Sequence, residues 1–142
     1  MVENYREKVK HLKVNSCEIA NKVWIFEDKA VIDAAKVLRD SYLRHIAVLN
    51  NEEKVVGIIS STDVVNRVVA EEKDYKNFKV REAMTKNPFV VKEDEELLGV
   101  YLNMIKRNLQ NVPVVSKSEK FLGFISFDCV VKKFAEFEAR EK

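Results

Sequence analysis

Two nine-residue stretches of the chain carry the residue types best suited to hold a small polar ligand. Residues 57–65 read GIISSTDVV and residues 123–131 read GFISFDCVV. In the first stretch a glycine permits close backbone approach, and Ser60, Thr62 and Asp63 follow at the expected start of a helix. A helix N-terminus offers N–H groups to an anion, and a carboxylate can accept two hydrogen bonds from vicinal sugar hydroxyls. This spacing suits a nucleoside that carries a ribose and a phosphate.

The same residue types also have a purely structural explanation. Ser, Thr and Asp are preferred at helix N-termini, so one copy alone favours capping over ligand binding. The ligand hypothesis gains from the repetition, because Ser60 and Ser126 both follow a glycine at the same spacing. The copies differ at the acid: Cys129 stands where the first copy has Asp63, and Asp128 comes one residue earlier.

The two stretches belong to a longer internal repeat. Shifting the chain by 66 residues aligns 14–68 with 80–134 without a gap, and apolar positions match apolar positions nearly throughout. This register indicates duplication of one structural unit. Two copies are too few for a solenoid, so each copy is expected to bury its apolar face against the other.

Each copy predicts the element order β-α-β-β-α, an α/β fold of the α+β type. In the first copy we expect strands at 23–26, 46–49 and 55–59, with helices at 31–38 and about 62–72. In the second copy we expect strands at 89–91, 112–115 and 121–125, with helices at 97–105 and about 128–140. Asp28 and Asp94 are the expected N-caps of the first helix in each copy. The last two strands should form an antiparallel hairpin, and the first should pair in parallel through the helical crossover.

The repeat divides the chain into four segments. Residues 1–13 form a basic leading segment that is expected to be partly helical, 14–72 the first domain, 73–79 a polar linker and 80–142 the second domain.

Composition excludes several classes of function. The 142 residues carry a formal net charge of +2 and are 46% hydrophobic, which gives a real core and no global reason for nucleic-acid binding. Cys17 and Cys129 fit no zinc motif and no disulfide framework, which favours a reducing compartment. No signal peptide and no apolar run of about 20 residues is present. We therefore expect a soluble cytoplasmic protein with no catalytic residues, no metal site and no catalytic cofactor.

Two other readings stay open at this point. Cys129 at a helix N-terminus could act as a nucleophile, although the repeat places neither His11 nor His45 beside it. A cluster of basic residues near both ends of the chain could contact nucleic acid; its members are Lys8, Lys10, His11, Lys13, Lys132 and Lys133.

The repeated unit resembles a cystathionine-β-synthase (CBS) domain, and residues 14–134 resemble a tandem CBS pair. The matching motifs are the strands His45-Ile46-Ala47-Val48 and Asn111-Val112-Pro113-Val114, and the signature G-h-h-[ST]-x-x-D. The resemblance implies two CBS units packed as a pseudo-twofold pair, and commonly a homodimer. It also implies a regulatory module that binds adenosine compounds such as AMP, ADP, ATP or S-adenosylmethionine.

The resemblance implies a main nucleotide cleft between the two repeats. Asp63 would accept from the ribose diol, Ser60 and Thr62 would lie near the ribose or phosphate, and Ile58 would pack on the base. The adenine would be enclosed from across the pair by Asn87, Pro88, Phe89, Leu109 and Gln110. Arg44 and His45 match a place where some family members contact phosphate, with a solvated strand edge as the alternative.

The second cleft departs from the family pattern. A thiol at Cys129 is a poor acceptor for a diol, and the carboxylate of Asp128 would repel a phosphate. We expect this cleft to be empty, weaker or selective for a less negatively charged ligand. Its lining would be Lys22, Val23, Leu43, Phe124, Ser126, Asp128 and Cys129.

The sequence therefore predicts a stand-alone regulatory CBS pair that senses an adenine nucleotide, AMP or ATP foremost, and acts on a partner protein. The alternative is a structural or protein-interaction module that dimerises, has degenerate clefts and has no physiological ligand. Apolar residues on the closing helices are expected at the pair or dimer interface; they are Val64, Val65, Val68, Val69, Val130, Val131, Phe134 and Phe137.

Overall fold

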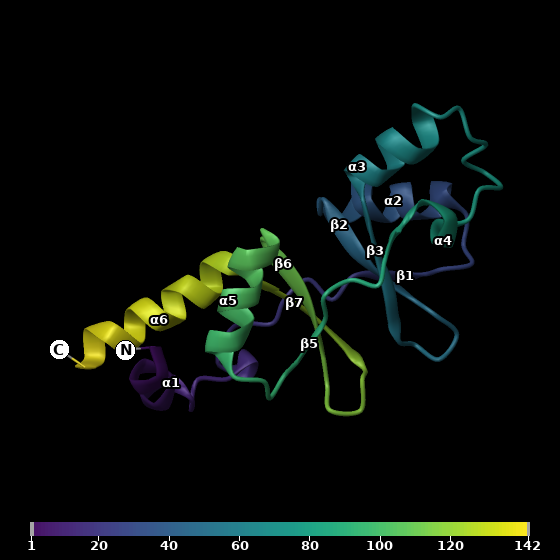
Figure 1. Cartoon of the computed structure of the whole chain (residues 1–142). Coiled ribbons are helices and arrows are strands. Elements are labelled where there is room, and N and C mark those ends of the chain that lie inside the picture. The colour runs from purple at the N-terminus through teal and green to yellow at the C-terminus, as the bar shows by residue number, and fades with distance from the viewer. Residues whose placement is uncertain (1, 142) are drawn as a thin grey trace. The chain divides into compact units, whose positions relative to one another are not determined.

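The computed structural model describes residues 2–141, which form two compact units (Figure 1). The first-sheet unit is Val23–Pro88, and the second-sheet unit joins residues 2–22 with 89–141. These units do not coincide with the sequence repeat. The segment 14–22, which opens the first repeat, packs with the second repeat's sheet, and 80–88, which opens the second repeat, packs with the first repeat's sheet.

The first-sheet unit contains a four-stranded sheet in the order β1-β2-β3-β4. Its strands are β1 (Trp24–Phe26), β2 (His45–Leu49), β3 (Val55–Ser60) and β4 (Thr85–Lys86). Its helices are α2 (Val31–Ser41), α3 (Ser61–Val64), the π-helix η2 (Val65–Val69) and α4 (Val80–Ala83). Strand β1 pairs in parallel with β2 through the α2 crossover, and β2 pairs antiparallel with β3, as the sequence predicts. Strand β4, which was not predicted, adds an antiparallel edge to β3.

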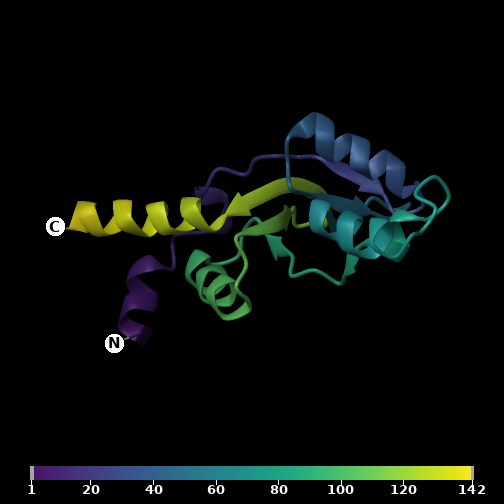
Figure 2. The same ribbon diagram turned by 90° about the horizontal axis from the view of Figure 1, so that it is seen from above.

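The second-sheet unit repeats this plan with three strands in the order β5-β6-β7. Its strands are β5 (Val91–Lys92), β6 (Asn111–Val115) and β7 (Phe121–Ser126). Its helices are α1 (Val2–Val9), the 3₁₀ helix η1 (Val14–Ser16), α5 (Leu97–Arg107) and α6 (Phe127–Glu141). Figure 2 shows α6 continuing directly from β7. An isolated bridge between Ala20 and Phe124 takes the place of β4, with the N–H of Phe124 donating to the carbonyl of Ala20 at 2.7 Å.

The predicted N-caps of α2 and α5 are wrong. Ala30 and Glu96 occupy the N-cap positions, and neither side chain makes a capping hydrogen bond. The helix N–H groups find backbone acceptors in the 73–79 linker and in the leading segment instead. The N–H of Val31 donates to Phe78 O and the N–H of Leu97 donates to Leu12 O, each at 2.8 Å. The carbonyls of Phe78 and Leu12 therefore accept from N–H groups that would otherwise need a capping side chain.

The closing helices of the two repeats differ from each other. Helix α6 is regular and agrees with its predicted range, whereas α3 gives way to the π-helix η2 and the helix ends before the predicted residue 72. Glu72 adopts a left-handed backbone with φ of 55°, and its N–H donates to Val69 O at 3.1 Å. That tight turn stops the helix. Single π turns inside helices are frequent near functional sites.

Each unit has its own hydrophobic core. One cluster centres on residues of α2, β2 and β3, and the other on residues of α5, β6 and β7. Val68 and Val130 are completely buried in these cores, so the expectation that they face an interface is wrong. Val65, Val69 and Val131 are exposed at 56%, 62% and 41%, so their predicted place in an interface stays a prediction. Across residues 2–141, no helix is long and apolar enough to cross a membrane.

Candidate functional site

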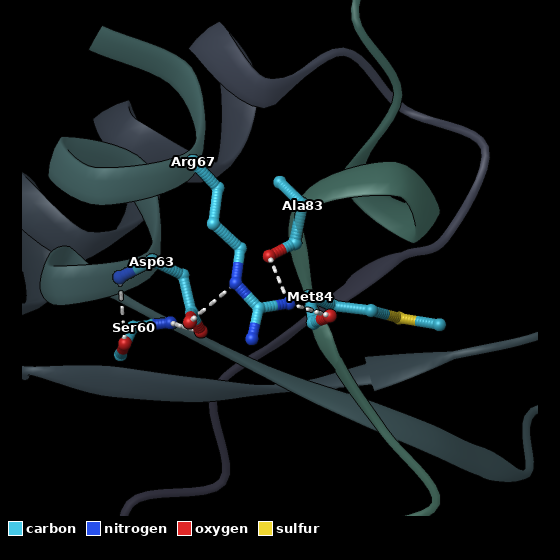
Figure 3. Close-up of polar contacts among 5 residues, drawn as sticks. All are labelled: Ser60, Asp63, Arg67, Ala83 and Met84. Atoms are coloured by element: carbon cyan, nitrogen blue, oxygen red, sulfur yellow. Dashed lines mark hydrogen bonds and ion pairs between the residues drawn. The ribbon is translucent and has the colours of Figure 1, made fainter. Parts of the chain in front are cut away.

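Asp63 and Ser60 hold each other at the junction of β3 and α3 (Figure 3). The N–H of Ser60 donates to Oδ2 of Asp63, and the N–H of Asp63 donates to Oγ of Ser60, each at 3.0 Å. This reciprocal capping box satisfies two backbone donors of the helix start. Asp63 is only 9% exposed, the single charged residue buried in the described part of the chain. The structural role considered from sequence is therefore present.

Arg67, which the sequence interpretation did not select, lies on the other side of this carboxylate. Its Nε is 3.7 Å from Oδ1 of Asp63, and its Nη1 donates to the carbonyls of Met84 at 2.9 Å and Ala83 at 3.5 Å (Figure 3). The spacing of four residues between Asp63 and Arg67 is the one that brings side chains together on a helix. The sequence could have indicated this pairing through its spacing, but it gives no sign that Arg67 contacts the carbonyls of Ala83 and Met84.

His45 and Arg44 lie at the start of β2, beside Ser60. His45 is the direct register partner of Ser60 across the antiparallel pair β2–β3, and the carbonyl of Arg44 accepts from the N–H of Ser61 at 2.9 Å. Burial lowers the pKa of His45 below its ordinary 6.5. Its imidazole is therefore neutral at pH 7, so of the two residues Arg44 is the one that would bring a positive charge to a phosphate. The Arg44 side chain is exposed.

The remaining predicted residues of the first-sheet unit lie on β3, on α3 and just after β4, where the N–H of Asn87 donates to Val56 O at the start of β3. Ile58 is half-buried on β3 and Thr62 is exposed on α3. Asn87 and Pro88 follow β4, and Asn87 adopts a left-handed backbone with φ of 51°. An open pocket of about 370 Å³ lies beside β3 and β4. It is lined by Glu27, Val56, Arg81, Glu82, Met84, Lys86 and Asn87.

The second-sheet unit gathers the rest of the predicted main cleft. Phe89 and Leu109 are partly buried against its core, and Gln110 is exposed just before β6. The guanidinium of Arg107 lies over the Phe89 ring, 4.7 Å from its centroid. Such a cation–π contact fixes an aromatic side chain and places a positive charge beside it. Arg107 was not predicted, and its contact depends on how α5 meets the segment before β5.

The second copy of the motif, residues 123–131, in which Cys129 replaces the acid (the degraded copy), keeps one of the two hydrogen bonds of the capping box. The N–H of Cys129 donates to Oγ of Ser126 at 3.1 Å, but a thiol replaces the carboxylate that returns the bond in the first copy. Asp128 is exposed, as is Lys22, while Phe124 is buried. Val23 and Leu43 pack against the core of the first-sheet unit. Burial raises the pKa of the Cys17 thiol to about 11, and the nearby Cys129 adds to this rise, so Cys17 is protonated at neutral pH.

Each predicted cleft thus takes residues from both compact units, and its assembly stays a prediction. Within the first-sheet unit the structure brings together Ser60, Asp63, His45 and Arg44. Among residues 2–141, no group of three or more His, Cys, Asp or Glu side chains is placed to hold a metal ion.

Comparison with known proteins identifies the family. The CBS domain model matches residues 17–70 and 80–136, so the chain belongs to the CBS domain family and carries a tandem pair. The α/β fold with two sheets agrees with solved CBS pairs. One is a CBS domain-containing protein of unknown function from Bacillus anthracis, at a TM-score of 0.75 and 18% identity, covering 92% of this chain and 98% of that one.

The curated relatives are much longer proteins. A homoserine O-acetyltransferase from Methanococcus vannielii is 32% identical over 102 residues, which is 72% of this chain and 20% of the enzyme. An L-aspartate semialdehyde sulfurtransferase from Methanocaldococcus jannaschii is 29% identical over 105 residues, 74% of this chain and 20% of the enzyme. The chain therefore spans about a fifth of these relatives, and the matched residues lie in its CBS pair.

Two solved CBS pairs contain adenosine compounds. The CBS domain pair of protein MJ0100, in complex with 5′-methylthioadenosine and S-adenosyl-L-methionine, is 26% identical at a TM-score of 0.70. The alignment covers 87% of this chain and 96% of that pair. CBSX2 in complex with AMP is 18% identical at a TM-score of 0.70, covering 89% of this chain and 98% of that one, and shares the fold.

Proposed function

We propose that the chain is a non-catalytic regulatory module that binds an adenosine compound between its two repeats and passes that signal to a partner protein. The observation that carries the proposal is the buried carboxylate of Asp63. It lies at the junction of β3 and α3, each of its oxygens has one local partner, and the resemblance to CBS pairs assigns it to the ribose diol. An ionised carboxylate oxygen can accept a second hydrogen bond, so two acceptor sites remain for a vicinal diol.

The other residues have proposed roles around that contact. Ile58 packs on the base, and Ser60 and Thr62 lie near the ribose or the 5′ substituent. The adenine is enclosed by residues of both units; these are Asn87, Pro88, Phe89, Leu109 and Gln110. Arg44 contacts a phosphate where the ligand carries one, and His45 adds a neutral hydrogen-bonding group.

The ligand class is a 5′-substituted adenosine, and the comparisons widen the list of candidates. AMP, ADP and ATP were the foremost candidates from sequence. The likeness to a pair that binds 5′-methylthioadenosine and S-adenosyl-L-methionine supports these two equally. Because all of these ligands share the adenine and the ribose diol, the Asp63 contact serves every member of the class.

A second candidate function is that of a dimerisation or protein-interaction module without a physiological ligand. The exposed apolar side chains of Val65 and Val69 favour it, since such residues commonly lie in interfaces. Ligand binding distinguishes the two functions, because only the regulatory module binds an adenosine compound.

The test is the melting temperature of the full chain with and without millimolar AMP, ATP, S-adenosylmethionine and 5′-methylthioadenosine. A ligand that binds only the folded state stabilises it by about 2.7 kcal/mol at a concentration of a hundred times Kd. For a domain of this size that energy corresponds to a rise of several degrees. No rise with any of the four would leave the interaction module as the better account.

Substitutions then locate the site. Asp63→Asn keeps an oxygen that can cap Ser60 but loses the charge that the diol binds, so affinity should fall roughly tenfold or more. Cys129→Ala removes the matching residue of the degraded copy and should change affinity less than twofold. Equal losses in the two variants would contradict the assignment of the main cleft to Asp63.

A further inference from the structure

Arg67 connects the proposed ribose acid with the edge strand of the same sheet. Its guanidinium faces Oδ1 of Asp63 through Nε and the carbonyls of Met84 and Ala83 through Nη1 (Figure 3). A planar guanidinium presents its donors in a fixed fork, so holding one side of the group orients the other. The two carbonyls, which belong to the backbone, act as the rigid anchor, and the carboxylate is the group that is oriented.

The Asp63 carboxylate has a partner at each oxygen: a hydrogen-bond donor at Oδ2 and the Arg67 cation beside Oδ1. The Ser60 N–H holds Oδ2 at 3.0 Å, and Arg67 Nε lies 3.7 Å from Oδ1. With only the first contact, the carboxylate could rotate about the bond to its Cβ, because that terminal torsion is broad. The positive charge of Arg67 beside Oδ1 favours one of these orientations. The remaining lone pairs then have a preferred direction on a side chain that is 12% exposed.

The ion pair itself adds little to folding stability. The Arg67 side chain is 51% exposed, and ion pairs of that exposure contribute little in water. The consequence of the contact is therefore expected in ligand binding, where the direction of the acceptors matters, more than in the melting temperature.

The Arg67 guanidinium also contacts the backbone a few residues before Asn87 and Pro88, which are proposed to enclose the adenine. Met84 precedes β4, and Asn87 and Pro88 follow β4 directly. Gly57 on β3 lacks the side chain that would collide with Met84 Sδ and would approach Thr85 O to 3.0 Å, which lets this segment lie close against β3. Arg67 thus ties the ribose-facing and base-facing parts of one unit into a single arrangement.

Building on the proposed function, we infer that Arg67 is a positioning residue that orients the Asp63 carboxylate for the ribose diol of the ligand. The degraded copy supports this pairing of roles. At the matching positions it has Cys129 in place of Asp63 and Lys133 in place of Arg67, so the acid and the arginine fork are absent together. The ammonium of a lysine is a point charge and cannot hold a carboxylate and a carbonyl with the same fixed geometry.

The experiment compares adenosine, the part shared by all candidate ligands, with 2′-deoxyadenosine, which lacks the 2′-hydroxyl. Dissociation constants are measured by NMR titration for the wild type, Arg67→Met, Arg67→Lys and Asp63→Asn. The wild type should prefer adenosine by roughly tenfold, because the 2′-hydroxyl donates to a charged acceptor. In Arg67→Met adenosine should weaken about three- to tenfold while 2′-deoxyadenosine stays within about twofold, and Arg67→Lys should restore part of the preference.

The control is Arg39→Met, which removes the same charge from α2, where Arg39 pairs only with its neighbour Asp40 in the described contacts. It should leave the ratio of the two dissociation constants unchanged. Circular dichroism spectra and melting curves establish that each variant is folded at the titration temperature.

The outcomes separate the two proposals. Equal weakening of both ligands in Arg67→Met, or an unchanged preference, overturns the positioning role while the proposed function stands, provided that Asp63→Asn still loses affinity. No binding of adenosine by the wild type, together with no response to the four ligands of the melting test, overturns both.

Discussion

At the scale of single residues, the capping role of Asp63 leaves its carboxylate able to accept further hydrogen bonds. The spacing Ser60-x-x-Asp63 follows the pattern of a capping box, and the structure contains both of its hydrogen bonds. One acceptor position on each oxygen is still available after capping. The frequency of Asp at helix starts is therefore no argument against a binding role for this residue.

His45 gives a pH dependence to the same corner of the molecule. Burial lowers its pKa from 6.5, so the folded chain resists a proton that the unfolded chain accepts. Below about pH 6.5 the unfolded state binds more protons, and the free energy of unfolding falls as the pH drops toward the lowered pKa. Above pH 6.5 this loss is absent.

His45→Asn should remove that dependence, and the second repeat already has Asn111 at the matching position. Urea unfolding between pH 7.5 and pH 5 should show a smaller loss of stability in the variant than in the wild type. One proton changes the slope by at most about 1.4 kcal/mol per pH unit, and solvent screening of this partly exposed ring keeps the effect below that limit. Parallel curves for the two proteins would contradict the assignment. His11→Asn serves as a control, since His11 is exposed.

At the scale of elements, the β-α-β-β-α order was predictable because hydrophobic periodicity and the repeat reinforce each other. The prediction of Asp28 and Asp94 as N-caps was wrong, because the acceptors at these helix starts are the carbonyls of Phe78 and Leu12, which come from distant segments of the chain. The contacts of the Arg67 guanidinium were hard to predict for the same reason, since they join segments that are distant in sequence. Local spacing indicates its pairing with Asp63, but its carbonyl partners are 16 and 17 residues away.

Two glycines of the second repeat, Gly123 and Gly99, separate local from tertiary constraints. Gly123 on β7 has φ of +138°, and an added Cβ would lie 2.6 Å from Ala20 O, the acceptor of the bridge that replaces β4. Gly99 lies in α5, where an added Cβ would meet nothing within 4 Å. The first glycine is required by its backbone and its neighbour, and the second only weakens a helix.

Gly123→Ala should therefore destabilise the chain by about 2–3 kcal/mol through backbone strain and the contact with Ala20. Gly99→Ala, the matched control, should stabilise it by about 0.5–1 kcal/mol because alanine favours the helix. Chemical denaturation of the two variants measures both effects. If Gly123→Ala were neutral, the close approach of the 14–22 segment to β7 would be wrong.

At the scale of the whole molecule, the duplication is preserved in the backbone more faithfully than in the side chains. Of the seven left-handed non-glycine residues in the described part of the chain, all but Glu72 fall in pairs 66 positions apart: Asn21 with Asn87, Tyr42 with Asn108, and Glu53 with Glu119. Both hairpins also carry a register shift at the matching place, at Val48/Leu49 and Val114/Val115. Tyr42 keeps the conformation of Asn108 although tyrosine rarely adopts it, so the conformation is set by the fold.

The last prediction concerns the homodimer that the resemblance implies, and which residues form its interface. Val65 and Val69 expose 56% and 62% of their surface on η2, and apolar residues gathered on one element are typical of an interface. A glutamate at either position would place a charge in that interface and weaken association roughly tenfold or more. Asn66→Glu is the matched control, because Asn66 is an exposed polar residue on the same element. Sedimentation equilibrium should give a dimer for the wild type and the control, and a larger monomer fraction for Val65→Glu and Val69→Glu. The same oligomeric state in all four proteins would exclude this face from the interface, and the sensing role of Asp63 would be unaffected.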